Sequence, residues 1–355
     1  LCTYFVSNKE ENIYKMKEYI NHSLLPYNTF GMDVKANRFV EYETLQELQS
    51  LLSDKNRFSS PYLHIGGGSN LLFTGDYSGL VLHSSIKGFS IENETEEWVE
   101  IKAGAGEVWD DFVAFTVENG WYGAENLSLI PGEVGASAVQ NIGAYGVEAK
   151  DIISKVYAVS VDDASLRIFT NDECMYSYRE SIFKHQLKGK YIIAYVTYRL
   201  KKQREFHLEY GNILSELEKK SISPSDLTLN DVRNVIIEIR RSKLPDPQVL
   251  GNAGSFFMNP IVSVEKYNSL SSVYPDMPHY KVDENTVKIP AGWMIDRCGW
   301  KGKSVGNAGV HDKQALVIVN RGGATGDEIV NLARLIVKSV EDKFGIIISP
   351  EVNFI

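Results

Sequence analysis

The sequence Ile65-Gly66-Gly67-Gly68-Ser69-Asn70-Leu71-Leu72-Phe73 places three consecutive glycines directly after a strand predicted for residues 63–65. Because glycine has no Cβ, the backbone N–H groups of such a loop stay open and can curve around an anion. Ser69 and Asn70 add side-chain donors at the end of the loop. The spacing matches neither a Walker A loop nor the G-x-G-x-x-G motif. Taken alone, the segment is compatible with a phosphate-binding loop and with an ordinary tight turn.

A second glycine-rich stretch covers residues 129–146 and reads LIPGEVGASAVQNIGAYG. Its small residues permit a close approach of backbone to a flat or phosphorylated ligand. A glycine-rich surface loop is the simpler alternative. The moderate apolarity favours a buried loop, whose polar groups must find partners. Two such segments in one chain together indicate a dinucleotide site.

The segments around these loops predict a mixture of strands and helices. In chain order we expect a helix at 44–52, a strand at 99–105, a helix at 108–120, a strand at 191–200, a helix at 231–241, a strand at 315–320, a helix at 325–345 and a short final strand. These elements do not follow a strict βαβ repeat, so the expected fold class is α+β. Pro245 and Pro247 cannot continue the preceding helix and mark a domain boundary.

Composition limits the possible functions. The 355 residues, 43% hydrophobic and 23% charged, are enough for two or three globular domains. A net charge of −9 argues against nonspecific nucleic-acid binding. The three cysteines lie far apart and the histidines show no ligand spacing, so we expect no disulfide framework and no metal. No apolar run is long enough to span a membrane. We expect a cytoplasmic protein in which residues 1–15 are a dispensable extension before Met16.

Three polar residues lie in unusually apolar surroundings. Arg179 follows two tyrosines in residues 176–184, and Ser255 lies between a glycine and two phenylalanines in residues 250–260. Glu351 lies in the apolar C-terminal segment. Each has a plain alternative: a solvated arginine with a packed stem, a turn-stabilising serine and a frayed terminal carboxylate. A guanidinium in such a place can also bind a carboxylate in bidentate fashion.

These segments, in this order and spacing, resemble the UDP-N-acetylenolpyruvoylglucosamine reductase (MurB) family. The likeness runs from about Asn21 to Ile355 and includes residues 26–31, 178–184 and 243–247. It implies an FAD-binding fold of the vanillyl-alcohol-oxidase (PCMH) type in two subdomains, plus a C-terminal α+β substrate-binding domain. The implied boundaries are 16–85 joined by 346–355 for the first subdomain, 86–244 for the second and 245–345 for the substrate-binding domain.

The resemblance also implies a reaction. NADPH would give a hydride to N5 of non-covalently bound FAD, which would pass it to C3 of the enolpyruvyl group of UDP-N-acetylglucosamine enolpyruvate, yielding UDP-N-acetylmuramate for peptidoglycan. Arg179 and Glu351 match the residues that stabilise the developing enolate, and Glu351 would have to hold or share a proton. Ser255 matches the general acid that protonates C2.

Further positions match ligand-binding residues of the family. Those implied to hold FAD are Gly66, Gly67, Gly68, Ser69, Asn70, Leu71, Pro131, Gly132, Gly135, Ser137, Gln140, Asn141, Gly143, Ala144 and Tyr145. Those implied to hold the substrate are Tyr145, Tyr178, Tyr210, Lys243, Asn259 and Gln314. Tyr210 resembles the substrate-covering tyrosine of the longer form of the enzyme. Met258 departs from the pattern, since the family usually has a basic residue there.

Two alternatives remain. One is an oxidase on the same fold that uses O₂, for which His64 before the glycines would be the candidate for covalent FAD attachment. The other is a non-catalytic flavin- or nucleotide-binding module, which would have no need of Arg179, Ser255 and Glu351 together. We expect His64 to end a strand with ordinary packing, and we expect a monomer.

Overall fold

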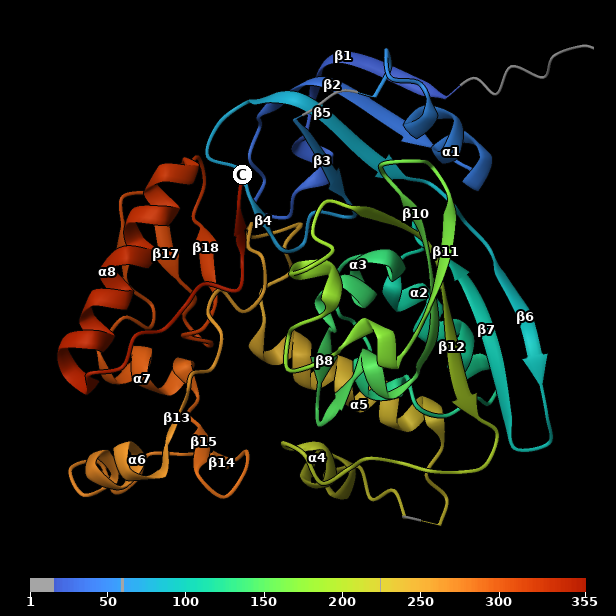
Figure 1. Ribbon diagram of the computed structural model, residues 1–355. Coiled ribbons are helices and arrows are strands. Elements are labelled where there is room, and N and C mark those ends of the chain that lie inside the picture. The colour runs from blue at the N-terminus through green and yellow to red at the C-terminus, as the bar shows by residue number, and fades with distance from the viewer. Residues whose placement is uncertain (1–15, 59–60, 224) are drawn as a thin grey trace, which may run out of the picture.

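The computed structural model describes residues 16–58, 61–223 and 225–355 and combines helices with several small sheets (Figure 1). The expected extension at residues 1–15 lies outside the described residues. The first sheet has the strand order β1-β2-β5-β3, with β1 antiparallel to β2 and both β2 and β3 parallel to β5. Its elements are β1 (Lys17–Ser23), β2 (Lys35–Tyr42), α1 (Leu45–Ser53), β3 (Tyr62–Ile65) and β5 (Tyr77–Ser84).

Helix α1 begins where the sequence predicts it, with a modified cap. The Thr44 side chain accepts a hydrogen bond from the Glu47 N–H at 3.1 Å, as an N-cap does. The Glu47 carboxylate accepts from the Glu43 N–H at 2.6 Å, one residue before the position that a capping box requires. Leu48 and Leu51 are buried, so the predicted apolar stripe faces the core.

The second sheet is antiparallel, with the order β11-β10-β12-β7-β6. Its strands are β6 (Phe89–Glu94), β7 (Trp98–Gly104), β10 (Ile153–Ser160), β11 (Leu166–Thr170) and β12 (Tyr191–Lys201). Helices α2 (Trp109–Glu118) and α3 (Val134–Gln140) lie beside it, with α5 (Leu229–Lys243) and the short α4 (Ile213–Lys219) beyond them (Figure 1). The apolar core between helices and sheet includes Trp109, Phe112 and Tyr198. The predicted strands and helices of this region are confirmed.

The C-terminal region consists of short elements around one long helix. They are β13 (Ile261–Ser263), α6 (Val264–Ser271), β14 (Tyr280–Lys281), β15 (Thr286–Lys288), α7 (Ala291–Arg297), β16 (Ser304–Val305), β17 (Ala308–Val310), β18 (Ile318–Asn320) and α8 (Gly326–Phe344). The helix predicted at 325–345 is confirmed: Thr325 and Glu328 form a capping box at its start, and the left-handed Gly345 ends it. The strand predicted at 315–320 is shorter, because the Val317 N–H closes a turn on the Gln314 carbonyl.

The chain end returns to the first glycine-rich loop. Strand β19 (Asn353–Phe354) pairs in parallel with β4 (Leu71–Leu72), and Figure 1 shows the C-terminus between the C-terminal region and the first sheet. Phe39 and Leu72 of the N-terminal region share one apolar cluster with Phe256 and Phe344. The return places Glu351 beside the glycine loop, as the resemblance implies.

Candidate active site

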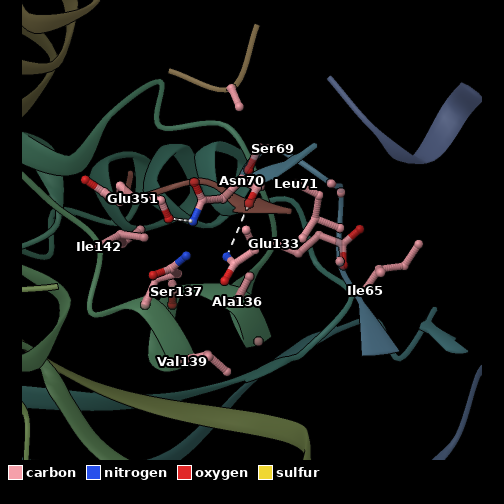
Figure 2. Close-up of a pocket in the computed structure, with 18 of the residues that line it drawn as sticks. Ile65, Ser69, Asn70, Leu71, Glu133, Ala136, Ser137, Val139, Ile142 and Glu351 are labelled. Atoms are coloured by element: carbon pink, nitrogen blue, oxygen red, sulfur yellow. Dashed lines mark hydrogen bonds between the residues drawn. The ribbon is translucent and has the colours of Figure 1, made fainter. Parts of the chain in front are cut away.

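A cavity of about 690 Å³ lies where both glycine-rich segments meet the C-terminal region. Residues 66–71 line one part of it, and residues from 130–143 line the facing wall. Figure 2 shows Ser69 and Asn70 close to Glu351 on one side, and Ser137 and Val139 of α3 on the other. The two segments that the sequence singles out as ligand-binding therefore share one cavity.

The glycines are required by how tightly the backbones pack. Gly68 has φ +64°, and a Cβ there would lie 1.9 Å from the Tyr27 carbonyl oxygen. A Cβ on Gly132, whose φ is +122°, would lie 2.9 Å from the Ser69 Oγ. The Ser69 hydroxyl donates to the Pro131 carbonyl at 3.0 Å and ties the two loops together. The result is a wall made of backbone, which fits the pyrophosphate of a dinucleotide.

The sequence suggests a loop over the whole second glycine-rich segment, but the structure has a helix within it. Residues 134–140 form α3, since alanine and valine at the spacing of a helix can bury one face against the second sheet. A Cβ on Gly135 would lie 2.9 Å from the Ala105 Cβ, so this glycine permits the contact of helix and strand. The Ser137 hydroxyl is within hydrogen-bond distance of the Val134 carbonyl and the Tyr198 hydroxyl, both inside the protein.

Arg179 and Glu351 form an ion pair inside the cavity. The Arg179 Nε lies 3.2 Å from the Glu351 Oε1, and each side chain is less than one-fifth exposed. Arg179 also donates from Nη2 to the Gly143 carbonyl at 2.7 Å. Its backbone has φ +60°, a left-handed conformation that is costly for a non-glycine residue and is common at functional sites. Burial raises the pKa of the Glu351 carboxyl, and the nearby Arg179 opposes this rise in part.

Ser255 faces the same cavity from a tight turn. Its hydroxyl makes no hydrogen bond to any residue that the structure describes. Gly254, at φ +66°, gives the turn its shape. The next residue, Phe256, accepts a hydrogen bond from the Glu351 N–H at 2.8 Å, which links the serine turn to the carboxylate. The Asn70 side chain donates to the Glu351 carbonyl at 3.1 Å, so the glycine loop is linked to the same residue.

A group of aromatic rings with one lysine lies around Tyr178. The Lys288 Nζ lies 4.4 Å from the centre of the Tyr178 ring, a cation–π contact. The Tyr280 ring stacks on that of Tyr210 with centroids 5.9 Å apart. Burial raises the pKa of Tyr210 to about 12 and lowers the pKa of Lys288. Tyr210 also packs over Gly146, so its loop rests on the second glycine-rich segment.

Most of the predicted site residues line the cavity. They are Gly66, Gly67, Gly68, Ser69, Asn70, Leu71, Pro131, Gly132, Gly135, Ser137, Gln140, Gly143, Tyr178, Arg179, Ser255, Asn259 and Glu351. Those outside its lining are Asn141, Ala144, Tyr145, Tyr210, Lys243 and Gln314. Lys243 is exposed in the last turn of α5, and Asn141 bonds to the backbone of Ser177 and Lys150.

Several cavity or neighbouring residues were missed by the sequence prediction. Arg240 and Glu133 line the cavity, and Lys288 lies over the rings of both Tyr178 and Tyr280. The sequence held a signal for Arg240. The apolar residues of the predicted helix indicate its buried face, and Arg240 lies beside that face, at a spacing of seven residues from Arg233. The sequence held no comparable signal for the others.

Other expectations concern histidine, metals and membranes. His64 lies on β3 and is among the residues that line the cavity, and its Nε2 is 2.7 Å from the Tyr42 hydroxyl. Burial lowers the pKa of His64 to about 3. Across residues 16–58, 61–223 and 225–355, no cluster of three potential metal-ligating side chains occurs. Within those same ranges, no helix has the length and apolarity that a membrane crossing requires.

The chain is similar to proteins of known family. A family model described as FAD binding domain matches residues 36–168, and one described as UDP-N-acetylenolpyruvoylglucosamine reductase, C-terminal domain, matches residues 246–355. The reductase of that name from Bacteroides fragilis is 56% identical over 94% of this chain and 99% of its own length. The one from Flavobacterium johnsoniae is 47% identical over 94% and 98%.

A solved structure shows the same fold. The crystal structure of UDP-N-acetylenolpyruvylglucosamine reductase from Thermus caldophilus matches with a TM-score of 0.66 and 21% identity, covering 96% of this chain and 98% of that one. The expected α+β fold with an FAD-binding domain is confirmed. Identity above one-half to a curated relative over nearly the whole of both chains leaves no ambiguity about the family. The chain belongs to the UDP-N-acetylenolpyruvoylglucosamine reductase family.

Proposed function

We propose that the protein reduces the enolpyruvyl group of UDP-N-acetylglucosamine enolpyruvate with NADPH, through non-covalently bound FAD, to give UDP-N-acetylmuramate. The observation that carries this proposal is the meeting of Arg179, Glu351 and Ser255 in one cavity with the glycine loops. These residues come from three distant segments of the chain. A flavin-binding module without catalysis would not need them together.

The residues present fit FAD. Gly66, Gly67, Gly68 and Gly132 line the cavity, so backbone without side chains faces a ligand there. The Gln140 Oε1 is buried beside the cavity without a hydrogen-bond partner in the described residues, and a polar cofactor would satisfy it. FAD bound there would supply the hydride acceptor and donor that amino-acid side chains lack.

Arg179 and Glu351 are proposed to bind and polarise the carboxylate side of the enolpyruvyl group. A guanidinium can hold a carboxylate in bidentate geometry and stabilise the negative charge that develops there. The raised pKa of Glu351 favours its protonated form, which donates a hydrogen bond to that charge and does not repel it.

Ser255 is proposed to deliver a proton to C2 of the substrate. Its hydroxyl faces the cavity with no partner in the described residues, so it is free to bond a ligand. A serine hydroxyl is a weak acid, and transfer requires the negative charge that the arriving hydride places on the substrate. The hydrogen bond between the Glu351 N–H and the Phe256 carbonyl holds the Ser255 turn at a fixed position relative to Glu351.

The remaining substrate contacts are proposed to come from both the second subdomain and the C-terminal region. Tyr178 and Asn259 line the cavity, whereas Tyr145, Tyr210, Lys243 and Gln314 are not among its lining residues. We propose that the reacting group of the sugar nucleotide lies inside the cavity and that its diphosphate and sugar extend beyond it. We propose 16–85 with 346–355 and 86–244 as the FAD-binding subdomains, and 245–345 as the substrate-binding domain.

We further propose a cytoplasmic monomer. Cys174 and Cys298 are free thiols, and unpaired cysteines are typical of a reducing compartment. Light scattering of the purified holoprotein would give its mass, and twice the chain mass would contradict the monomer.

The function is tested with the purified protein under anaerobic conditions. Its visible spectrum would be recorded before NADPH, after NADPH and after UDP-N-acetylglucosamine enolpyruvate. We expect a flavin spectrum that NADPH bleaches and that only this substrate restores. A flavin restored only by O₂ would instead indicate the oxidase. A protein that takes up no FAD would refute the proposal.

A further inference from the structure

A buried asparagine joins two segments that lie far apart in the chain. Asn126 belongs to the short 3₁₀-helix Glu125–Leu127 and is 1% exposed. Its Nδ2 donates to the Tyr145 carbonyl at 2.9 Å and to the His207 carbonyl at 2.7 Å. A side-chain amide has two N–H donors, so both are used. Tyr145 belongs to the second glycine-rich segment, and His207 belongs to the segment that carries Tyr210.

The position of Asn126 is itself fixed by its neighbours in the chain. The Trp109 Nε1 donates to the Leu127 carbonyl at 2.9 Å, and the Glu125 carboxylate accepts from the Gly123 N–H at 2.7 Å. Trp109 is fully buried in the apolar core beside the second sheet. The two carbonyls that Asn126 holds are therefore tied to this core.

The segment that carries Tyr210 has no regular structure to fix it. Residues 203–211 form neither helix nor strand, and most of their side chains are exposed. The Phe206 ring packs on the Tyr122 ring with centroids 5.4 Å apart. His207 comes next, and its carbonyl is the one that Asn126 holds. Tyr210 follows three residues later, so these two contacts limit where its side chain can lie.

Two Tyr-Gly pairs pack against each other beyond the asparagine. A Cβ on Gly146 would lie 3.2 Å from the Tyr210 Cβ, and a Cβ on Gly211 would lie 3.6 Å from the Tyr145 Cδ1. Each tyrosine thus lies on the glycine that follows the other tyrosine. Gly146 and Gly211 have φ +85° and +72°, which glycine adopts without strain. The segments that Asn126 joins through their carbonyls therefore also fit together through their side chains.

Tyr210 is connected to the cavity through other side chains. Its ring stacks on the Tyr280 ring with centroids 5.9 Å apart. The Lys288 Nζ lies 6.0 Å from the centre of the Tyr280 ring and 4.4 Å from that of the Tyr178 ring. Tyr178 lines the cavity. Tyr210 is therefore beside the cavity, where its hydroxyl can donate to a ligand that extends beyond it.

We propose that Asn126 is a positioning residue for the sugar nucleotide. By holding the carbonyls of Tyr145 and His207, it fixes the Tyr210 segment to the second glycine-rich segment before the substrate binds. Ordering this segment at the moment of binding would cost affinity, and a segment that is already in place avoids that cost. This inference rests on the proposed function, because it requires a substrate that extends from the cavity to Tyr210.

The test compares the steady-state kinetics of holoproteins, with enzyme concentrations based on bound flavin. Asn126→Ala removes both donors. We expect KM for UDP-N-acetylglucosamine enolpyruvate to rise about tenfold, the scale of one or two lost hydrogen bonds. We expect kcat per bound flavin to change less than about twofold, because Asn126 does not contact the reacting groups. Titration of the oxidised holoprotein with the same substrate, followed by the flavin spectrum, should show the same factor in Kd.

Asn171→Ala is the matched control. The Asn171 Nδ2 also donates to two carbonyls, those of Lys150 at 2.8 Å and Ile153 at 2.7 Å, and Asn171 does not line the cavity. This variant should lower the melting temperature, as Asn126→Ala does, and leave KM unchanged. A similar rise in KM for both variants would mean general destabilisation and would overturn the inference. If Asn126→Ala does not fold, Asn126→Ser keeps one donor and should raise KM about threefold.

A double-mutant cycle shows whether Asn126 acts through Tyr210. Tyr210→Phe removes the hydroxyl, keeps the ring on Gly146 and should by itself raise KM. In that background Asn126→Ala should raise KM by less than about twofold more, because the group that Asn126 positions is absent. Equal factors in the two backgrounds, or an unchanged KM for either single variant, would overturn the inference.

Failure of the inference is distinguishable from failure of the proposed function. The proposed function stands as long as the parent protein takes up FAD and its NADPH-reduced flavin is reoxidised by the sugar nucleotide. A parent that fails at either step would refute the proposed function, and the inference with it.

Discussion

The two ends of the cavity are built in opposite ways. The glycine wall is made of backbone from two segments, and the Tyr27 backbone leaves no room for a Cβ on Gly68. The other end, called the reacting end because we propose that the reaction occurs there, is made of the side chains of Arg179, Ser255 and Glu351, brought together from positions far apart in the chain. Substitutions that add side-chain volume to the glycine wall should therefore lower FAD affinity and the free energy of unfolding. Substitutions that remove a charge or a proton donor from the reacting end should lower the rate of the reaction.

The largest effect is expected at the reacting end. Ser255→Ala should slow reoxidation of the reduced flavin by the enolpyruvyl substrate about 10³-fold, within the range of general acid catalysis. Reduction by NADPH should change less than about twofold, because the proton is needed only in the second half-reaction. Stopped-flow absorbance separates the two steps. An equal loss in both would show that Ser255 shapes the site and does not donate the proton.

At the glycine wall we expect a smaller effect of a different kind. Gly68→Ala would push a methyl group into the Tyr27 carbonyl at a positive φ, and should cost about 2–3 kcal/mol of unfolding free energy together with FAD affinity. Gly75→Ala is the matched control, since a Cβ there would meet nothing within 4 Å. Urea unfolding and FAD titration measure both quantities. If the two variants behaved alike, the close packing of the loops would not be what requires glycine.

Glu351 gives a test that depends on pH. Burial raises its pKa, so the protonated form that the mechanism needs is fully present at low pH and is lost as pH rises through the raised pKa. The rate of the second half-reaction should therefore fall as pH rises through this pKa, which gives a descending limb in the pH profile. Glu351→Gln, a permanently neutral substitute, should lower the rate about tenfold and remove the limb, on the scale of one lost hydrogen bond to a developing charge. A rate that increased with pH would mean that the ionised carboxylate is the active form.

The same contrast explains what the sequence could predict. The glycine wall could be predicted because three adjacent glycines indicate a backbone conformation or contact that side chains would prevent. The helix that starts at Thr325 could be predicted from its capping residues. The Tyr178 ring that Lys288 contacts lies in another element, so the position of Lys288 depends on how distant segments pack. The glycines and small residues of 129–146 predict a loop, whereas burial against the second sheet stabilises helix α3 within it. The roles proposed for Arg179, Ser255 and Glu351 come from the likeness to a family and not from a local sequence pattern.

The smallest effect is expected at Met258, where the family pattern has a basic residue. Phe257 and Asn259 line the cavity and Met258 does not, as expected for alternating side chains in extended backbone. The Met258 N–H bonds to the Ser349 carbonyl at 3.0 Å, which fixes this direction. Met258→Lys should therefore change kcat/KM for the sugar nucleotide by about twofold or less, the size of a typical surface substitution. Met258→Leu is the neutral control. A tenfold gain for lysine but not for leucine would extend the charged end of the cavity to position 258 and show that this chain lacks one of its usual cations.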